Sequence, residues 1–393
     1  MQTIEKYHDP NQGRDIINSN FSELSGGVAT NLWISGSSGS FSIKASNDSG
    51  LDATGNYSYA EGYQTLASGT SCHAEGGRTV AGANYSHAEG YRSISKGSYS
   101  HAEGWLTVAT GGASHAEGTG SESLGNYSHT EGSYSISSGQ SSHAEGNNTH
   151  AYGDNSHAEG YYAVALGIAS HAEGSGATAS GVASHAEGHI TTASGNFSHA
   201  EGQLSIASGR CSHAEGVSYS YALASHSEGN SSAFGVASHS EGDSYAYGNY
   251  SHSEGYVGSA FGFASHAEGS ATAIGDYSHA QGYTTANDFS EFTAGQYNII
   301  SSGNTTTWTA TDNLFTAGNG VDNENRSNAF QIKKDGRVYC QSSLQIGDNS
   351  YSASSLNVGA IRYRTSGNNS YVDVCMQTGA TTYAWVNIVA KNW

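Results

Sequence analysis

The motif Ser-His-Ala-Glu-Gly, which spans Ser86–Gly90 and recurs through the middle of the chain, combines three residue types that can do chemistry. A serine nucleophile, a histidine base and a carboxylate make a hydrolytic triad. In an extended strand, however, Ser86 and His87 point to opposite faces, so they cannot share the hydrogen bond that activates a nucleophile. The motif therefore predicts a protein that is not an enzyme.

The same motif invites a second interpretation, a metal site. A His-x-Glu triplet places both side chains on one face of a strand, about 6.6 Å apart along the backbone. Histidine and glutamate both ligate zinc, but no cysteine ligand pair accompanies the motif. We therefore expect no metal site and no cofactor. One alternative stays open, because threefold symmetry could gather three histidines round a cation.

The motif repeats with a fixed period, which is the signature of a repeat architecture. Eleven motif histidines follow one another at steps of 14 residues, each with a glutamate two positions later. The histidines are His73, His87, His101, His115, His129, His143, His157, His171, His185, His199 and His213, and the glutamates are Glu75, Glu89, Glu103, Glu117, Glu131, Glu145, Glu159, Glu173, Glu187, Glu201 and Glu215.

The series extends in both directions. It continues at His226, His239, His252, His266 and His279 with steps of 13 or 14 residues, and Tyr59 occupies the same place one period before His73. Each unit has a second, looser half, such as Leu106–Gly111 (LTVATG). Both halves alternate small residues with larger ones, which is typical of strands. We predict two strands of about five residues per unit, each ending at a glycine turn.

Two strands and two turns in 14 residues predict a narrow β-solenoid, in which equivalent strands stack in parallel about 4.8 Å apart. Serine, alanine and threonine fit the inside of so thin a coil, and the larger residues then point outward. The expected fold class is all-β, a solenoid of about 17 coils of 13–14 residues.

We interpret the repeated His-x-Glu pair as a structural ladder. Glutamates stacked about 4.8 Å apart repel one another by about 0.9 kcal/mol per pair in water. The parallel row of histidines is the obvious partner, through hydrogen bonds within one strand or across to another chain. If the histidines are stabilised in their charged form, their pKa should be raised on folding.

The repeat resembles the head repeats of trimeric autotransporter adhesins (YadA-like heads), and Ser270–Gly275 (SATAIG) is close to their SVAIG-type motif. Variants with Ser-His-Ala-Glu-Gly also resemble repeats of bacteriophage tail and fibre proteins. The resemblance covers about residues 55–283. It implies a left-handed parallel β-roll, with three chains packed about a threefold axis.

Trimerisation has an independent reason in the residues themselves. Val108, Ile136, Val164 and Ile206 lie at outward positions of the second half and form a discontinuous apolar stripe. A single chain would leave this stripe in water, and its small-residue interior buries little apolar surface. Neighbouring copies of the chain are therefore expected to complete the core.

The segments outside the repeat divide the chain further. Residues 1–54 resemble segments that attach phage fibres to the virion, with a short helix expected over 13–24. Residues 284–350 form a neck-like β region with clustered basic residues, and residues 351–393 are a β-meander tip with strands at 360–365, 370–376 and 382–389. Aromatic residues crowd into this tip and suit either a sugar receptor or a trimer core. They are Tyr351, Tyr363, Tyr371, Tyr383, Trp385 and Trp393.

Composition narrows the function further. The 393-residue chain has 34 acidic and 14 basic residues, a formal net charge of −20, which disfavours nucleic acid as a partner. Its start shows no signal peptide, and no apolar run of membrane-spanning length occurs, so no membrane insertion is expected. Cys72, Cys211, Cys340 and Cys375 form no C-x-x-C pair, so free thiols are expected.

These features together predict a homotrimeric structural fibre of a tailed bacteriophage virion, assembled in the host cytoplasm. Its expected partners are two further copies of the chain, virion proteins at the N-terminal end and a glycan or protein of the host surface. Two alternatives stay open: a bacterial trimeric surface adhesin, and a purely decorative head or baseplate fibre that binds no receptor.

Overall fold

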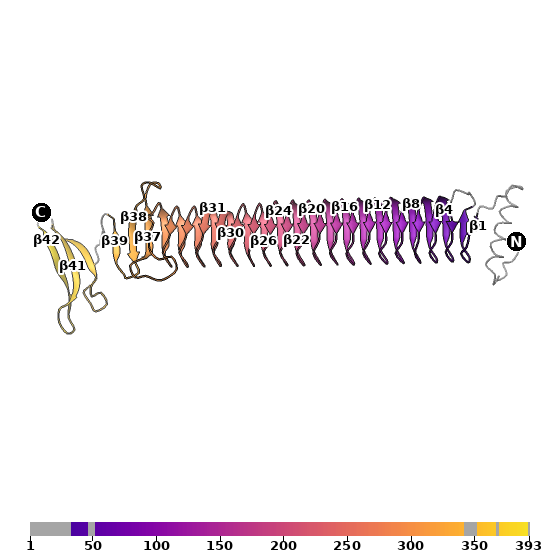
Figure 1. Cartoon of the computed structure of the whole chain (residues 1–393). Helices are drawn as coiled ribbons and strands as arrows, with labels where there is room; N and C mark the ends of the chain where they lie inside the picture. The colour runs from indigo at the N-terminus through magenta and orange to yellow at the C-terminus, as the bar shows by residue number, and fades with distance from the viewer. Residues whose placement is uncertain (1–32, 46–51, 342–351, 367–368, 392–393) are drawn as a thin grey trace.

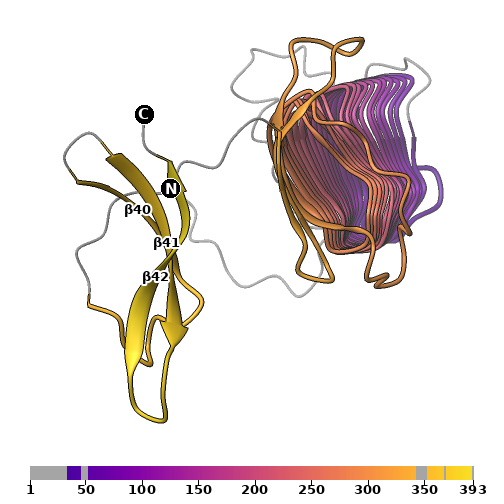
Figure 2. The ribbon, with the colours of Figure 1, turned by 90° about the vertical axis from the view of Figure 1, so that its left-hand side faces the viewer.

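The computed structural model describes residues 33–45, 52–341, 352–366 and 369–391. All regular secondary structure in these ranges is β, as predicted, and most of it belongs to a solenoid of about 18 turns. Figure 1 shows the turns stacked into a straight rod, and Figure 2, turned by 90°, shows the narrow cross-section of the coil. The expected helix over 13–24 lies outside the described residues.

Each coil of the rod carries a longer strand, which holds the His-x-Glu pair in the coils from His73 to His266. These strands are β2 (Ile43–Ala45), β4 (Tyr59–Tyr63), β6 (His73–Gly77), β8 (His87–Tyr91), β10 (His101–Trp105), β12 (His115–Thr119), β14 (His129–Ser133), β16 (His143–Asn147), β18 (His157–Tyr161), β20 (His171–Ser175), β22 (His185–His189), β24 (His199–Gln203), β26 (His213–Gly216), β28 (His226–Gly229), β32 (His266–Gly269), β34 (His279–Gly282) and β36 (Phe292–Gln296).

A second, shorter strand completes each coil. These strands are β3 (Asp52–Ala53), β5 (Leu66–Ala67), β7 (Val80–Ala81), β9 (Ile94–Ser95), β11 (Val108–Ala109), β13 (Glu122–Ser123), β15 (Ile136–Ser137), β17 (His150–Ala151), β19 (Val164–Ala165), β21 (Thr178–Ala179), β23 (Thr192–Ala193), β25 (Ile206–Ala207), β27 (Tyr219–Ser220), β29 (Ser232–Ala233), β33 (Thr272–Ala273) and β35 (Thr285–Ala286). In two coils both halves merge into one strand, β30 (His239–Ala246) and β31 (His252–Ala260).

The second strand is shorter than predicted: it has two residues, not about five. Its neighbours on either side already belong to turns, because a coil of 14 residues must reverse direction twice. Like residues face like residues in the stack. His101 pairs with His115 and Glu103 with Glu117 between β10 and β12, and Val108 pairs with Ile94 between β11 and β9.

The interior of the rod is built from very small side chains. Among the described residues, every buried hydrophobic residue is alanine apart from Cys72 and Cys375. Buried serines add short hydrogen bonds, as where the Ser100 hydroxyl donates to the carbonyl oxygen of Gly97 at 2.6 Å. The four cysteines are free thiols, as predicted. Small inward residues and larger outward ones therefore follow the predicted alternation.

Glycine recurs at two positions of most coils for two different reasons, although Ala83 and Ala222 take the second position in their coils. Gly90 has φ 96°, in the left-handed region that other residues avoid. Gly111 has no such backbone conformation, but a Cβ built on it would lie 1.8 Å from the carbonyl oxygen of Gly125 in the next coil. The first glycine makes the turn, and the second allows neighbouring turns to approach each other.

Parallel stacking continues beyond both ends of the predicted repeat region. At the N-terminal end β2 pairs with β4, and β1 (Trp33–Ser35) adds to β2 in antiparallel fashion. At the other end β36 pairs in parallel with β37 (Asn313–Asn319). The strands β38 (Asn328–Lys333) and β39 (Val338–Cys340) then follow as an antiparallel extension of β37.

A separate three-stranded antiparallel sheet follows near the C-terminus. It consists of β40 (Ile361–Ser366), β41 (Asn369–Gln377) and β42 (Tyr383–Lys391), paired in sequence order. These bounds agree with the three predicted strands to within two residues. Asp373 is buried in this sheet and accepts hydrogen bonds from Arg364 at 2.6 Å and Arg362 at 3.1 Å.

Candidate functional site: the histidine and glutamate ladders

The motif histidines form one continuous stack along the rod. From His73 to His266 the centroids of successive rings lie 4.7–4.9 Å apart and the rings are close to parallel. The stack ends against Phe292, which takes the histidine position one coil after His279. The predicted histidine ladder is thus a single array of rings on one outer face.

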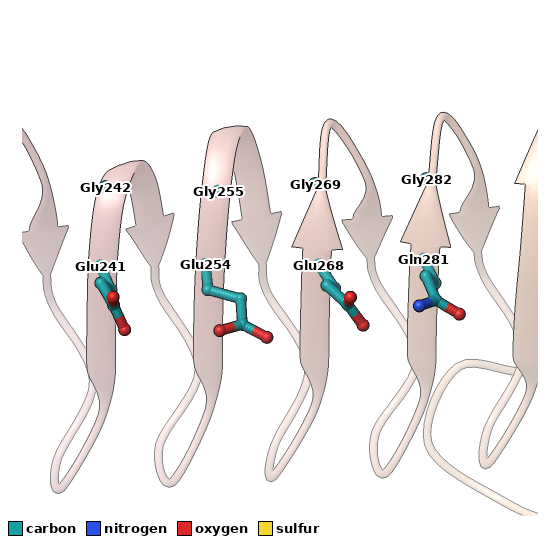
Figure 3. Close-up of a pocket in the computed structure, with 8 residues that line it drawn as sticks. All are labelled: Glu241, Gly242, Glu254, Gly255, Glu268, Gly269, Gln281 and Gly282. Atoms are coloured by element: carbon teal, nitrogen blue, oxygen red, sulfur yellow. The ribbon is translucent and has the colours of Figure 1, made fainter.

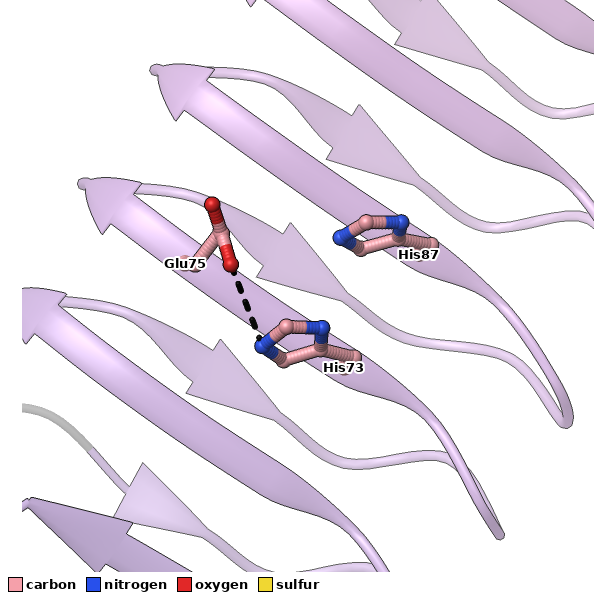
Figure 4. A group of neighbouring side chains, drawn as sticks. All are labelled: His73, Glu75 and His87. Carbon is pink, nitrogen blue, oxygen red and sulfur yellow. Dashed lines mark ion pairs between the residues drawn. The ribbon is translucent and has the colours of Figure 1, made fainter.

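Nine of the histidines between His73 and His199 lie beside the glutamate of their own strand. His266 and His279 instead lie beside the glutamate of the preceding coil. Figure 4 shows His73 and Glu75, whose Nε2 and Oε2 atoms are 3.4 Å apart. Along the rod this distance grows to 4.0 Å at His185 and Glu187, beyond the range of a hydrogen bond. The Nε2 atoms of all sixteen motif histidines are buried and have no hydrogen-bond partner within the chain.

The charge state of the histidines differs from the expectation of a raised pKa. Burial of the rings lowers the pKa below the ordinary value of 6.5, and the neighbouring histidines lower it further, while the glutamates only partly oppose this. The lowered pKa is found at His87, His101, His115, His143, His157, His185, His213, His226, His252 and His279. The expectation was wrong because it counted the ion pair and left out desolvation.

The glutamates form a second row beside the glycine turn. Burial raises the pKa of Glu131, and repulsion from Glu145 and Glu117 adds to this. Near the C-terminal end of the rod the row borders a shallow groove (Figure 3), where glutamate gives way to Gln281. The groove is lined by Glu241, Gly242, Glu254, Gly255, Glu268, Gly269, Gln281 and Gly282. Stacked carboxylates so close together make this face strongly acidic.

The ladder does not form a converging metal site within one chain. Ligand atoms of His73, Glu75 and His87 lie within 4.8 Å of one another, and the same holds for further rungs. The stacked rings, however, point their nitrogens in parallel directions, as Figure 4 shows, rather than toward a common point. A metal ion needs its ligands to converge on it, so two successive imidazoles would have to leave the stack to share one.

The motif also lacks the geometry of a hydrolase. The hydroxyl of Ser86 is buried inside the coil and donates to the carbonyl oxygen of Ala83 at 2.7 Å. His87 and Glu89 stand on the outer face of the same strand. The serine and the histidine are therefore separated by the sheet itself, as the alternation of the strand predicts.

The predicted receptor contacts of the C-terminal sheet are partly occupied within the chain. The guanidinium of Arg362 lies 4.2 Å from the ring centroid of Trp385, and that of Arg364 lies 4.0 Å from the ring of Tyr371. Tyr363 is 37% exposed, and Tyr383 is half-buried. Tyr351 and Trp393 lie outside the described residues.

Sequence reasoning identified the apolar stripe but missed a row of aromatic rings further along the rod. Val108, Ile136, Val164 and Ile206 are the outward residues of their short strands and are half-buried. In four successive coils nearer the C-terminal end of the rod, the residue two positions further along is an exposed ring, and these rings stack on one another at centroid distances of 4.7–5.2 Å. They are Tyr221, Phe234, Tyr247 and Phe261. The signal was present, since these residues recur at the same phase of the repeat.

Sequence reasoning also missed a buried polar cluster at the C-terminal end of the rod. Glu291 takes the place of the inward serine in the last coil, and Asp288 takes the place of the close-packed glycine. Both are buried. The carboxylate of Glu291 accepts hydrogen bonds from the amides of Asn287 and Asp288, and Asp288 accepts from the amide of Asn313. These carboxylates close the open end of the solenoid.

Comparison with known proteins does not assign the chain to a family. No protein-family model matches the sequence, and no curated protein matches it. Among the described residues, no helix is both long enough and apolar enough to pass through a lipid bilayer.

Proposed function

We propose that the chain is a structural, non-enzymatic fibre of a tailed bacteriophage virion, in which three copies pack side by side and contribute to adhesion to the host surface. The observation that carries the proposal is the regular rod of about 18 turns, with an interior of alanine and serine and a discontinuous apolar stripe outside. Such a rod gives distance and stiffness, and its repeated surface suits lateral packing of identical chains.

Two features of the surface support association between chains. The stripe of Val108, Ile136, Val164 and Ile206 and the stacked rings further along the rod expose apolar surface. The second feature is the row of sixteen buried imidazole Nε2 atoms that have no hydrogen-bond partner in the chain. A buried polar atom without a hydrogen bond costs free energy of folding. Neighbouring copies of the chain can cover the apolar surface and supply hydrogen-bond acceptors for the imidazole nitrogens.

The trimer makes a direct prediction about mass in solution. We expect a particle of about 122 kDa, three times the 40.6 kDa chain, because the apolar stripe is then removed from water. Light scattering coupled to size exclusion measures this without a shape assumption, which matters for a rod. A folded monomer that persists at micromolar concentration would contradict the proposal.

The role in a virion is tested by locating the protein and by two truncations. Immunogold electron microscopy should place it on phage particles, whereas labelling of bacterial surfaces would support the alternative of a bacterial adhesin. Removal of residues 1–32, which leaves the stacked strands from β1 onward, should give trimers that fail to join particles. Removal of residues 351–393 should leave the fibre on the particle but weaken adsorption to cells.

The outcome of the second truncation separates two versions of the proposal. If particles without residues 351–393 adsorb as well as the parent, then receptor binding does not belong to the C-terminal sheet. The fibre would in that case be decorative or bind through its shaft. Circular dichroism of the purified truncated fibre is the control that the rod itself remains folded.

A further inference from the structure

The polar cluster at the C-terminal end of the rod contains an asparagine, Asn313, that lies between a lysine and a glutamate and contacts both. Asn313 in β37 and Lys333 in β38 face each other across an antiparallel pair, so their side chains lie on the same face. The Nζ atom of Lys333 lies 2.5 Å from Oδ1 of Asn313. Since a C=O bond is about 1.23 Å long, the amide carbon lies within about 3.7 Å of the amine nitrogen.

The side chain of Asn313 is held from several directions. It is 1% exposed, and its backbone amide donates to Oδ2 of Asp288 at 2.7 Å. The Nε2 atom of Gln331 donates to Oδ1 at 2.9 Å. This second donor polarises the carbonyl and is placed to stabilise negative charge on the oxygen, as the donors of an oxyanion hole do.

Glu291 completes the group on the other side of the amide. Its carboxylate is 1% exposed, accepts a hydrogen bond from the hydroxyl of Thr316 at 2.9 Å, and has the side chain of Asn313 as a further hydrogen-bonding neighbour. Burial raises the pKa of Glu291. A carboxyl group with a raised pKa holds its proton more readily than an ordinary glutamate and can pass it to a leaving group.

We propose that Lys333 and Asn313 join in an intramolecular isopeptide bond, with Glu291 as the group that delivers a proton to the leaving nitrogen. The ammonium of Lys333 gives up one proton to solvent, and its nitrogen then attacks Cγ of Asn313, so that the N–C bond forms as the carbonyl oxygen takes up negative charge beside Gln331. The attacking nitrogen releases a further proton to solvent, while Glu291, which neighbours the Asn313 side chain, delivers a proton to Nδ2 and regains one from solvent. The Cγ–Nδ2 bond then breaks, ammonia leaves, and the carbonyl reforms.

The reaction needs nothing beyond the chain and solvent. An amine and a carboxamide become a secondary amide and ammonia, so no oxidant, reductant or external enzyme takes part. The reacting atoms are already near the separation of about 3–3.5 Å at which bound groups react efficiently. The product would link β37 to β38 covalently and so stabilise the antiparallel pair at the end of the rod. This inference does not depend on the proposed role of the protein in a virion.

Intact mass spectrometry of the purified full-length protein tests the proposal, because loss of ammonia removes about 17 Da. The folded parent should weigh this much less than its sequence requires. Lys333→Arg keeps the positive charge but cannot form the bond, so this variant should show its full sequence mass. Lys334→Arg, one residue further on, is the matched control and should keep the loss.

Peptide mapping separates this bond from other losses of ammonia, such as cyclisation at Gln2 or at Asn319 before Gly320. Trypsin should fail to cut after Lys333, and fragmentation should show a branched peptide that contains both Lys333 and Asn313. Glu291→Gln should lower the linked fraction while leaving the rod folded by circular dichroism. A folded parent that shows the full sequence mass, or an unlinked Asn313 peptide, overturns the proposal.

Discussion

Replacement of Gly111 with alanine is expected to destabilise the rod more than any conservative change on its surface. The new Cβ would lie 1.8 Å from the carbonyl oxygen of Gly125 and 2.4 Å from its carbonyl carbon. Both are backbone atoms of the next coil, so no side-chain rotation relieves the contact. Ala83 and Ala222 occupy the same position in their own coils, so the backbone can admit a Cβ there at some cost. We therefore expect the free energy of unfolding to fall by about 1–3 kcal/mol, the typical range for overpacked cores.

The adjacent glycine provides the matched control. A Cβ on Gly112 would meet nothing closer than Oδ1 of Asn126 at 3.3 Å, the end of an exposed side chain that accepts a hydrogen bond from the amide of Gly112. Gly112→Ala should therefore melt within a few degrees of the parent. Thermal melts followed by circular dichroism, together with limited proteolysis near residue 111, measure both variants. Equal melting temperatures for Gly111→Ala and Gly112→Ala would show that neighbouring turns are not as close as described.

Acid should unfold the rod, which is the second large effect expected. Burial lowers the pKa of ten ladder histidines below 6.5. The unfolded chain therefore binds more protons than the folded one below about pH 6.5, so stability is complete above that pH and falls as the pH drops toward the folded values. The effect of one rung is small because the rings are partly exposed, but the losses at successive rungs add along the ladder.

Melting temperatures between pH 8 and pH 5 measure this effect. They should be constant down to about pH 6.5 and then fall steeply. Replacement of six consecutive ladder histidines with glutamine should flatten the profile, whereas His189→Gln, at an exposed position outside the ladder, should leave it unchanged. A melting temperature that rises toward pH 5 would mean that charged histidines stabilise the fold, as the simple ion-pair argument assumed.

The repeat architecture could be predicted because each coil repeats the same pattern of small, large and glycine residues. Small residues such as Ser86 and Ala88 alternate with His87 and Glu89, and glycines recur at fixed phases, so period and inward face can be counted from the sequence. The turns were harder to predict. Tyr85 and Leu106 have φ of 58° and 60°. This left-handed conformation is uncommon for residues other than glycine, so it cannot be predicted from their residue types. Stacking on the next coil, not local preference, holds them there.

The positions of the residues in the candidate site could be predicted from the sequence, but the pKa of its histidines could not. The residues of the ladder, their register and their common face follow from the spacing alone. The pKa of His87 depends instead on how far the ring is buried by its neighbours, which spacing does not reveal. The cluster of Glu291, Asn313 and Lys333 was missed because its members come from three segments that only the closing of the rod brings together.

The direction of the hydrogen bonds between coils has a mechanical consequence. These bonds, such as the one from the amide of His101 to the carbonyl oxygen of Ser114 at 2.9 Å, run along the rod. A pull on the two ends of a single chain therefore loads them one coil at a time, as in the opening of a zip. Each freed coil of 14 residues lengthens to about 46–50 Å from a rise of about 4.8 Å. Lateral contact with neighbouring copies would share that load across several chains. Association of the chains would therefore oppose stretching of the rod as well as remove apolar surface from water.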